Sequence, residues 1–286
     1  MDGSQQDARS AAWPPARRSS RFAWWLIVLT LAGFTLRVVY LLSQQDLAVG
    51  GDGFHFLNSA RLADRGQWFE FPFGGGPDAH HPPLWTALLS LVSISGANGR
   101  LTFQLFAVVG SSSIALVGLA GRKIVDQRVG LIAATLAALY PGLWRYEREL
   151  LSEVCSFHSS RSAVLLAREG RTAGIYRPFQ EARLSTRWSG TAEWVGYAWT
   201  VTYWVLVPFA VAGGVILRRR RVPLYPLLVE FAIVLISAAI TFGLIRYRAA
   251  AEVPFLILSA VAIDSLARIR ASGFAAEMTR LDRMEK

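Results

Sequence analysis

The sequence has little of several residue types on which common protein functions depend. Cys155 is its only cysteine, so the chain holds neither an internal disulfide nor a metal site built from several thiolates. Charged residues make up 17% of its 286 residues, whereas a soluble domain averages roughly 25%. The mean hydropathy is +0.34. These shortages exclude a small disulfide-stabilised secreted domain and indicate an integral membrane protein.

Lysine is also scarce, because Lys123 and Lys286 are the only lysines among 30 basic residues. The formal net charge of +10 is therefore carried by arginines, and most of these lie beside apolar runs. A basic protein can bind nucleic acid, but arginines at the ends of hydrophobic segments are typical of topology signals under the positive-inside rule. We therefore expect the lipid bilayer, and no nucleic acid, as a partner.

Hydrophobic runs separated by charged markers predict an all-α, polytopic transmembrane protein. A helix needs about 20 apolar residues to cross a bilayer. The predicted spans cover residues 22–42, 101–120, 129–143, 196–217, 224–244 and 253–266. Arg122, Lys123 and the four consecutive arginines at 218–221 mark ends that face the cytosol. The alternation predicts six spans with both termini in the cytosol, the first span being a retained anchor rather than a cleaved signal peptide.

These spans divide the chain into segments. Residues 1–21 are polar and are expected to form a disordered cytosolic tail. An N-terminal membrane module covers residues 22–153, and an extracytoplasmic connector covers 154–195. A C-terminal membrane module at 196–270 and a second cytosolic tail at 271–286 follow. The first module carries a large extracytoplasmic loop at 43–100. Within this loop, residues 54–68 have helical spacing, and residues 84–94, which are too few to cross the bilayer, are expected to form an interfacial helix.

The extracytoplasmic loop gathers candidate catalytic groups. Asp52 lies in a Gly-Gly-Asp-Gly sequence just after the first span, where it is either a turn residue or a general base that takes a proton from an incoming hydroxyl. His80 and His81 follow Asp78. Imidazole and carboxylate groups bind metals, but adjacent histidines rarely reach one ion, so a hydrogen bond to substrate is favoured and no metal site is predicted. A requirement for a divalent metal stays open, and no cofactor is assigned.

Charged residues near the predicted outer surface suggest an anion-binding site. Arg37 lies in the outer turns of the first span, where it either extends its charge to the surface or contacts a phosphate. Arg246 and Arg248 lie outside against the usual charge bias, which favours an anionic partner over simple anchoring of a helix end. An acidic cluster follows the third span. It either lines a substrate pocket or forms an ion-paired end of a helix. Its members are Glu147, Glu149 and Glu153.

The order of these motifs resembles that of the multi-spanning glycosyltransferases of the GT-C fold, and in particular the bacterial relatives of dolichyl-phosphate-mannose protein mannosyltransferases. The resemblance covers residues 22–153 and continues from near 163 to 268. The motifs that carry it are Leu36-Arg37-Val38-Val39-Tyr40, Gly51-Asp52, His81-Pro82-Pro83-Leu84-Trp85, Arg122-Lys123, Tyr140-Pro141-Gly142-Leu143-Trp144, Leu150-Leu151-Ser152-Glu153, residues 170–178, Arg246-Tyr247-Arg248 and Ala251-Glu252.

The resemblance implies an enzyme of a bacterial plasma membrane that uses a polyprenyl-phosphate sugar donor in the outer leaflet. Its acceptor would be a hydroxyl group on a protein, lipid or glycan. Asp52 would activate this hydroxyl for an inverting displacement, and Arg246 and Arg248 would stabilise the departing phosphate, where negative charge develops. The pocket for the sugar and the acceptor would be shaped by His81, Glu147 and Glu153.

The chain is shorter than the proteins it resembles between the motifs at 150–153 and 170–178, which residues 154–162 join directly. We infer an internal deletion from this direct junction, and topological parity requires that an even number of spans was lost. Two alternatives to an active enzyme follow: a non-catalytic membrane remnant or assembly partner, and a transporter. Transport is less favoured, because the predicted spans hold few charges and show no repeated halves.

Overall fold

The computed structural model describes residues 20–43, 52–74, 76, 86–87, 89–90, 99–144, 179–180, 192–240 and 249–284. The regular elements in this part of the chain are all helices, which confirms the all-α prediction. Two segments, Arg21–Ser43 and Glu193–Arg219, are long and apolar enough to cross a membrane, as judged by length and composition alone. Gln127–Leu139 and Tyr225–Ile236 are shorter apolar helices. These segments favour an association with membranes.

The helices are α1 (Ser20–Ser43), α2 (Asp52–Asp64), α4 (Gly99–Ile124), α5 (Gln127–Leu139), α6 (Pro141–Trp144), α9 (Glu193–Arg219), α10 (Tyr225–Ile240) and α11 (Ala249–Met284). The apolar runs predicted at 22–42, 101–120 and 196–217 lie within α1, α4 and α9. The run predicted at 129–143 is interrupted, because α5 ends at Leu139 and Pro141 opens the short α6. Proline suits this first helical position, since its missing N–H has no partner to lose there.

Two helices differ in extent from the predictions. The helix expected at 54–68 is α2, which begins at Asp52 and ends at Asp64. The last run was expected at 253–266, followed by a tail, whereas α11 continues without interruption to Met284. The interfacial helix expected at 84–94 lies mostly outside the described residues, although 86–87 and 89–90 are helical.

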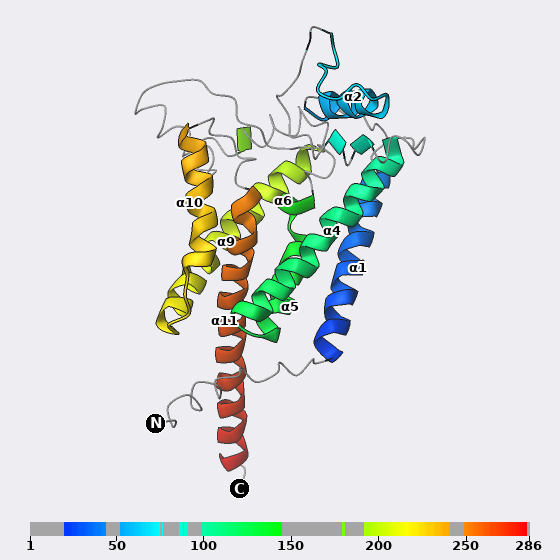
Figure 1. Cartoon of the computed structure of the whole chain (residues 1–286). Coiled ribbons are helices and arrows are strands. Elements are labelled where there is room, and N and C mark those ends of the chain that lie inside the picture. The colour runs from blue at the N-terminus through cyan, green and yellow to red at the C-terminus, as the bar shows by residue number, and fades with distance from the viewer. Residues whose placement is uncertain are drawn as a thin grey trace, which may run out of the picture.

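Figure 1 shows α1, α4, α5, α9, α10 and α11 lying side by side and alternating in direction, with α2 across one end of the bundle. We call this end the α2 end. The opposite end, at which α1 begins and α11 ends, is called the terminal end (Figure 1). Phe56 and Ala60 of α2 pack against Leu41 of α1 and Ala107 of α4, which seats α2 on the bundle.

The bundle is held together by α11, which packs against α9 and α5, and by the α4–α5 hairpin, which packs against α1. Glycine permits two close approaches. A Cβ at Gly130 would lie 2.9 Å from the backbone nitrogen of Arg122 on α4, and a Cβ at Gly213 would overlap the carbonyl group of Leu258 on α11. Small residues at such crossings are the usual means by which helices pack closely in membranes.

Candidate functional site

A buried carboxylate lies near the α2 end, where three helical segments meet. Glu252, in the first turn of α11, is 1% exposed. The indole N–H of Trp199 on α9 lies 2.9 Å from Oε1 of Glu252 and 3.0 Å from the hydroxyl oxygen of Tyr140, so one hydrogen is shared between two acceptors. The Tyr140 hydroxyl donates in turn to Oε1 of Glu252 at 3.3 Å. The three side chains close a ring of hydrogen bonds, which we call the Glu252 ring.

The local structure explains why these groups meet. Tyr140 caps the end of α5, in an extended conformation between Leu139 and the helix-opening Pro141. Gly142 follows, and a Cβ there would overlap Tyr140 and Trp199 and lie 2.6 Å from Oε2 of Glu252. Only glycine therefore leaves room for the ring. The bend between α5 and α6 thus supplies both a hydroxyl group and the space for the carboxylate.

Aromatic side chains also connect α6 and α9 to α1. The ring of Tyr40, on α1, lies 4.7 Å from that of Trp144 on α6 and 6.3 Å from that of Trp194 on α9, both edge-to-face. Trp144 is 5% exposed, and its Nε1 has no hydrogen-bond acceptor in the part of the chain that the structure describes. A buried donor without an acceptor costs about 1–3 kcal/mol. Such a donor marks a position at which a water molecule or a ligand oxygen would be stabilised.

Arg37 is buried between α1 and α4 rather than extended to the surface. It is 1% exposed, and its Nη1 donates to Oγ of Ser111 at 3.2 Å. Ser111 donates to the carbonyl oxygen of Ala107 one turn earlier on α4. The side chain is therefore buried against α4, and its contact with a phosphate stays a prediction. Its buried guanidinium is an ionisable group inside an apolar helix bundle, the kind that marks a functional site by default.

The remaining predicted site residues are less fully described. Asp52 is the first residue of α2, so the structure places its backbone at the α2 end but does not describe its side chain. The others lie outside the described residues, and these are His81, Glu147, Glu153, Arg246 and Arg248. His80, which was weighed as a metal ligand, also lies outside them. Of the predicted set, the structure therefore places Arg37 inside the bundle on α1 and the backbone of Asp52 at the start of α2, which lies across the α2 end (Figure 1).

The sequence analysis missed the Glu252 ring. Glu252 appeared there only as part of a motif that carries the family resemblance. The available signal was an acidic residue in the first turn of an apolar helix, which is rare unless the carboxylate has a partner or a function. The ring partners could not be found from spacing, because Tyr140 is 112 residues and Trp199 is 53 residues from Glu252 in sequence.

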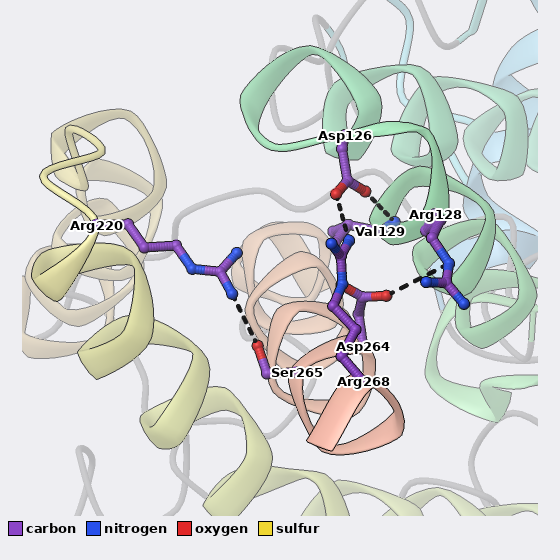
Figure 2. A network of polar contacts seen from close by, with 7 residues as sticks. All are labelled: Asp126, Arg128, Val129, Arg220, Asp264, Ser265 and Arg268. Atoms are coloured by element: carbon purple, nitrogen blue, oxygen red, sulfur yellow. Dashed lines mark hydrogen bonds and ion pairs between the residues drawn. The ribbon is translucent and has the colours of Figure 1, made fainter. Parts of the chain in front are cut away.

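A second polar cluster lies at the terminal end and consists of ion pairs (Figure 2). Arg268 on α11 donates to Asp264 through Nε at 2.6 Å and to Asp126 through Nη2 at 2.6 Å. Nε of Arg128 lies 3.9 Å from the other oxygen of Asp264. Asp126 also caps α5 by accepting the backbone N–H of Val129 at 2.9 Å. The cluster ties α11 to the α4–α5 hairpin.

The ion pairs shift the pKa values of two of these groups. Partial burial acts to raise the pKa of Asp126, but the hydrogen bonds from Val129 and Arg268 outweigh it and lower the pKa below the ordinary value. The hydrogen bond to Asp264, followed by that to Asp126, raises the pKa of Arg268. Both groups therefore stay charged at neutral pH. Among the described residues, no group of His, Cys, Asp and Glu side chains is arranged to hold a metal ion.

Comparisons with protein-family models, with curated proteins and with solved structures found no match to this chain.

Proposed function

We propose that the chain is a multi-pass protein of a bacterial plasma membrane in which α1, α4, α5, α9, α10 and α11 cross the bilayer. The alternating helix directions in Figure 1 support this topology, because they bring both ends of the described chain to one side. Large apolar side chains that are more than half exposed also support it, since an aqueous surface would not favour them. Examples are Leu31 on α1, Val211 on α9 and Ile233 on α10. The terminal end, which carries arginines 218–221, would face the cytosol.

We further propose that this protein is a GT-C-type glycosyltransferase that moves a sugar from a polyprenyl-phosphate donor to a hydroxyl acceptor at the extracytoplasmic face. One observation supports this most directly: α2, which begins at Asp52, lies across one end of the bundle (Figure 1), and Arg37 of α1 and Glu252 of α11 are buried within the bundle. A general base at the membrane surface, above buried charged groups, suits a lipid-linked donor whose phosphate enters from the bilayer. The motif resemblance supports the same reaction class.

The proposed reaction is a single displacement. The acceptor oxygen attacks the anomeric carbon of the sugar, the bond from that carbon to the phosphate oxygen breaks, and the acceptor proton passes to the carboxylate of Asp52. The polyprenyl phosphate leaves with the bonding electron pair. Arg246 and Arg248, which directly precede the first residue of α11, would stabilise the charge on this leaving group, with Arg37 as a further cation. The sugar and acceptor would contact His81, Glu147 and Glu153.

Replacement of Asp52 tests the proposed chemistry. We expect Asp52→Asn to reduce sugar transfer by at least about 100-fold, because general-base catalysis contributes roughly 10²–10⁴-fold. The assay would use the purified full chain in liposomes containing polyprenyl-phosphate sugars and would measure the release of polyprenyl phosphate. Asp64→Asn is the matched control, since Asp64 is an exposed carboxylate at the other end of α2. Equal activity of Asp52→Asn and the parent would remove Asp52 from the mechanism.

The topology is tested separately by cysteine labelling. In a Cys155→Ser background, Gln67→Cys after α2 and Ala271→Cys on α11 introduce single thiols at exposed positions near opposite ends of the molecule. We expect a membrane-impermeant maleimide to label the first from outside intact spheroplasts and the second only after permeabilisation. Labelling of both from the same side would contradict the six-span arrangement.

A further inference from the structure

The terminal end carries more positive than negative side chains among the described residues. Exposed basic side chains come from the α4–α5 hairpin, the α9–α10 turn and α11, and they are Lys123, Arg128, Arg218, Arg219, Arg220, Arg221, Arg268 and Arg270. Arg268 donates to Asp126, at the end of the α4–α5 hairpin, and to Asp264, on the facing turn of α11. Arg128 also forms an ion pair with Asp264. The positive charge of the α9–α10 turn is thus not balanced by these ion pairs.

Arg220 and Ser265 form a distinct feature within this basic surface. Figure 2 shows Arg220 extending from the end of α9 toward α11, where its Nη2 donates to Oγ of Ser265 at 3.3 Å. A hydroxyl group is neutral, so it leaves the guanidinium charge uncompensated. The guanidinium fork matches the geometry of a phosphate group, and a serine hydroxyl can donate to the same anion. The pair therefore supplies donors suited to a phosphate.

Aromatic residues indicate the depth at which this pair would sit in a membrane. Trp24 and Trp25, near the start of α1, are 64% and 54% exposed, and Tyr225, at the start of α10, is 73% exposed. Exposed tryptophan and tyrosine rings are typical of the boundary between the lipid and water. Tyr225 follows Arg221 by four residues. The arginines of the α9–α10 turn thus lie close to the level expected for lipid headgroups.

We propose that Arg220 and Ser265 bind the phosphate of an anionic phospholipid in the leaflet that surrounds the terminal end. This inference rests on the membrane orientation given under the proposed function, but not on any catalytic activity. Clusters of arginine and lysine beside membrane helices attract anionic lipids, and basic pockets between such helices hold their headgroups. A pure topology signal would make all four consecutive arginines equivalent, whereas a headgroup site gives Arg220 a larger role than its neighbours.

The test uses the purified full chain in a neutral detergent at physiological ionic strength. Phosphatidylglycerol or phosphatidylcholine is titrated, and the lipid affinity is obtained from the saturable rise in the unfolding temperature. We expect phosphatidylglycerol, and not phosphatidylcholine, to stabilise the parent. Arg220→Gln should weaken the affinity by about tenfold or more, because hydrogen bonds to a charged group contribute roughly 1.5–3 kcal/mol. Arg218→Gln, which removes the same charge from the same helix end, should weaken it by no more than about threefold in screened solution.

Two further variants sharpen the test. Ser265→Ala should weaken the affinity by about fivefold, since a net hydrogen bond contributes roughly 1 kcal/mol. Arg220→Lys, which keeps the charge but loses the planar fork, should fall between the parent and Arg220→Gln.

Three results would overturn the proposal. Equal losses in Arg218→Gln and Arg220→Gln would show attraction to the surface charge alone. Equal stabilisation by the two lipids would remove the anionic requirement, and full competition by glycerol phosphate would identify a site for a soluble phosphate. A failure of the proposed membrane topology is distinguishable, because the chain would then be extracted from membranes by alkaline carbonate before any lipid is tested.

Discussion

The two ends of the bundle hold buried carboxylates in different ways. Asp264, near the terminal end, is 1% exposed and lies against the guanidinium groups of Arg268 and Arg128. Glu252, near the α2 end, is also 1% exposed, yet the hydrogen bonds of its ring come from two neutral donors, Tyr140 and Trp199. The first arrangement pairs a carboxylate with two arginines, and the second joins a carboxylate to a tyrosine hydroxyl and an indole N–H.

This difference separates structural from functional use of acidic residues. The ion pairs of Asp264 join α11 to the α4–α5 hairpin and neutralise a carboxylate that is itself buried. A carboxylate inside an apolar bundle carries a desolvation cost of several kcal/mol, which its partners must offset. Buried ionisable groups such as Glu252 and Arg37 are therefore candidates for a role beyond folding.

The largest effect is expected from removing the N–H of Trp199. Trp199→Phe keeps an aromatic ring but leaves Glu252 and Tyr140 without the donor that lies 2.9 Å and 3.0 Å away. Loss of a donor to a buried polar group costs about 1–3 kcal/mol, so we expect a clear fall in the unfolding temperature in detergent. If the Glu252 ring is energetically important, no comparable loss should follow the same substitution at a tryptophan without an acceptor.

Trp144→Phe provides that comparison. Trp144 is also buried, but its Nε1 has no acceptor among the described residues. Its substitution loses packing contacts but also removes a buried donor that has no acceptor, so the net loss should be smaller than at Trp199. Equal destabilisation by the two substitutions would show that the hydrogen bonds of the ring contribute nothing measurable.

An intermediate effect, of the opposite sign, is expected at the terminal end. Arg221 adopts φ 58°, and the N–H groups of Arg221 and Val222 bond back to Arg218 and Leu217, which closes α9 as a Schellman motif. The left-handed conformation costs a non-glycine residue about 1–2 kcal/mol. Arg221→Gly should therefore stabilise the protein by about 0.5–1 kcal/mol after the entropy of glycine is subtracted.

Arg219→Gly is the matched control, because Arg219 is the last residue of α9 proper. Glycine within a helix costs up to about 1 kcal/mol, so this variant should be less stable than the parent. The two unfolding temperatures, measured in the same detergent without added anionic lipid, should lie on opposite sides of the parent value. A loss of stability in both variants would contradict the strain assigned to Arg221.

Sequence reasoning located most helices because hydropathy changes sharply at their ends. The run predicted at 22–42 corresponds to α1, Ser20–Ser43, for this reason. It did not indicate where α11 ends, because the apolar run ends at 266 and the helix continues to Met284. Hydropathy reports where a chain suits lipid, whereas helix length also depends on backbone propensity. The segment 267–284 contains no proline and is rich in alanine and arginine, so the helix continues after the apolar run has ended.

The candidate site was only partly predictable, for a different reason. Asp52 could be singled out because its polar neighbours are adjacent in sequence. The Glu252 ring joins residues from α11, α9 and the end of α5, and its geometry exists only once these helices have packed. Arg37 could be identified as unusual from its position within an apolar run, but its burial against Ser111 depends on where α4 lies. Tertiary contacts of this kind leave no periodic signal in a single sequence.

The smallest effect is expected from removing the charge of Asp126. This prediction concerns how the ion pairs at the terminal end contribute to stability as the pH changes. Asp126→Asn keeps a good N-cap for α5 but loses the ion pair with Arg268, so we expect a loss of about 0.5 kcal/mol at pH 7. The pKa of Asp126 is lowered below its ordinary value of 3.8 in the folded protein. Its contribution is therefore fully present above that value and is lost as the pH falls through the lower, folded pKa.

The difference in unfolding temperature between the parent and Asp126→Asn should thus be constant from pH 5 to pH 8 and shrink below about pH 4. Asp64→Asn serves as the control for the same change of side chain, because Asp64 is an exposed carboxylate at the end of α2 with no ion pair among the described residues. A difference for Asp126→Asn that persisted unchanged at pH 3 would mean that the cap geometry, and not the charge, stabilises the junction of α5 with α11. The two ends of the bundle would then differ less in electrostatics than their contacts indicate.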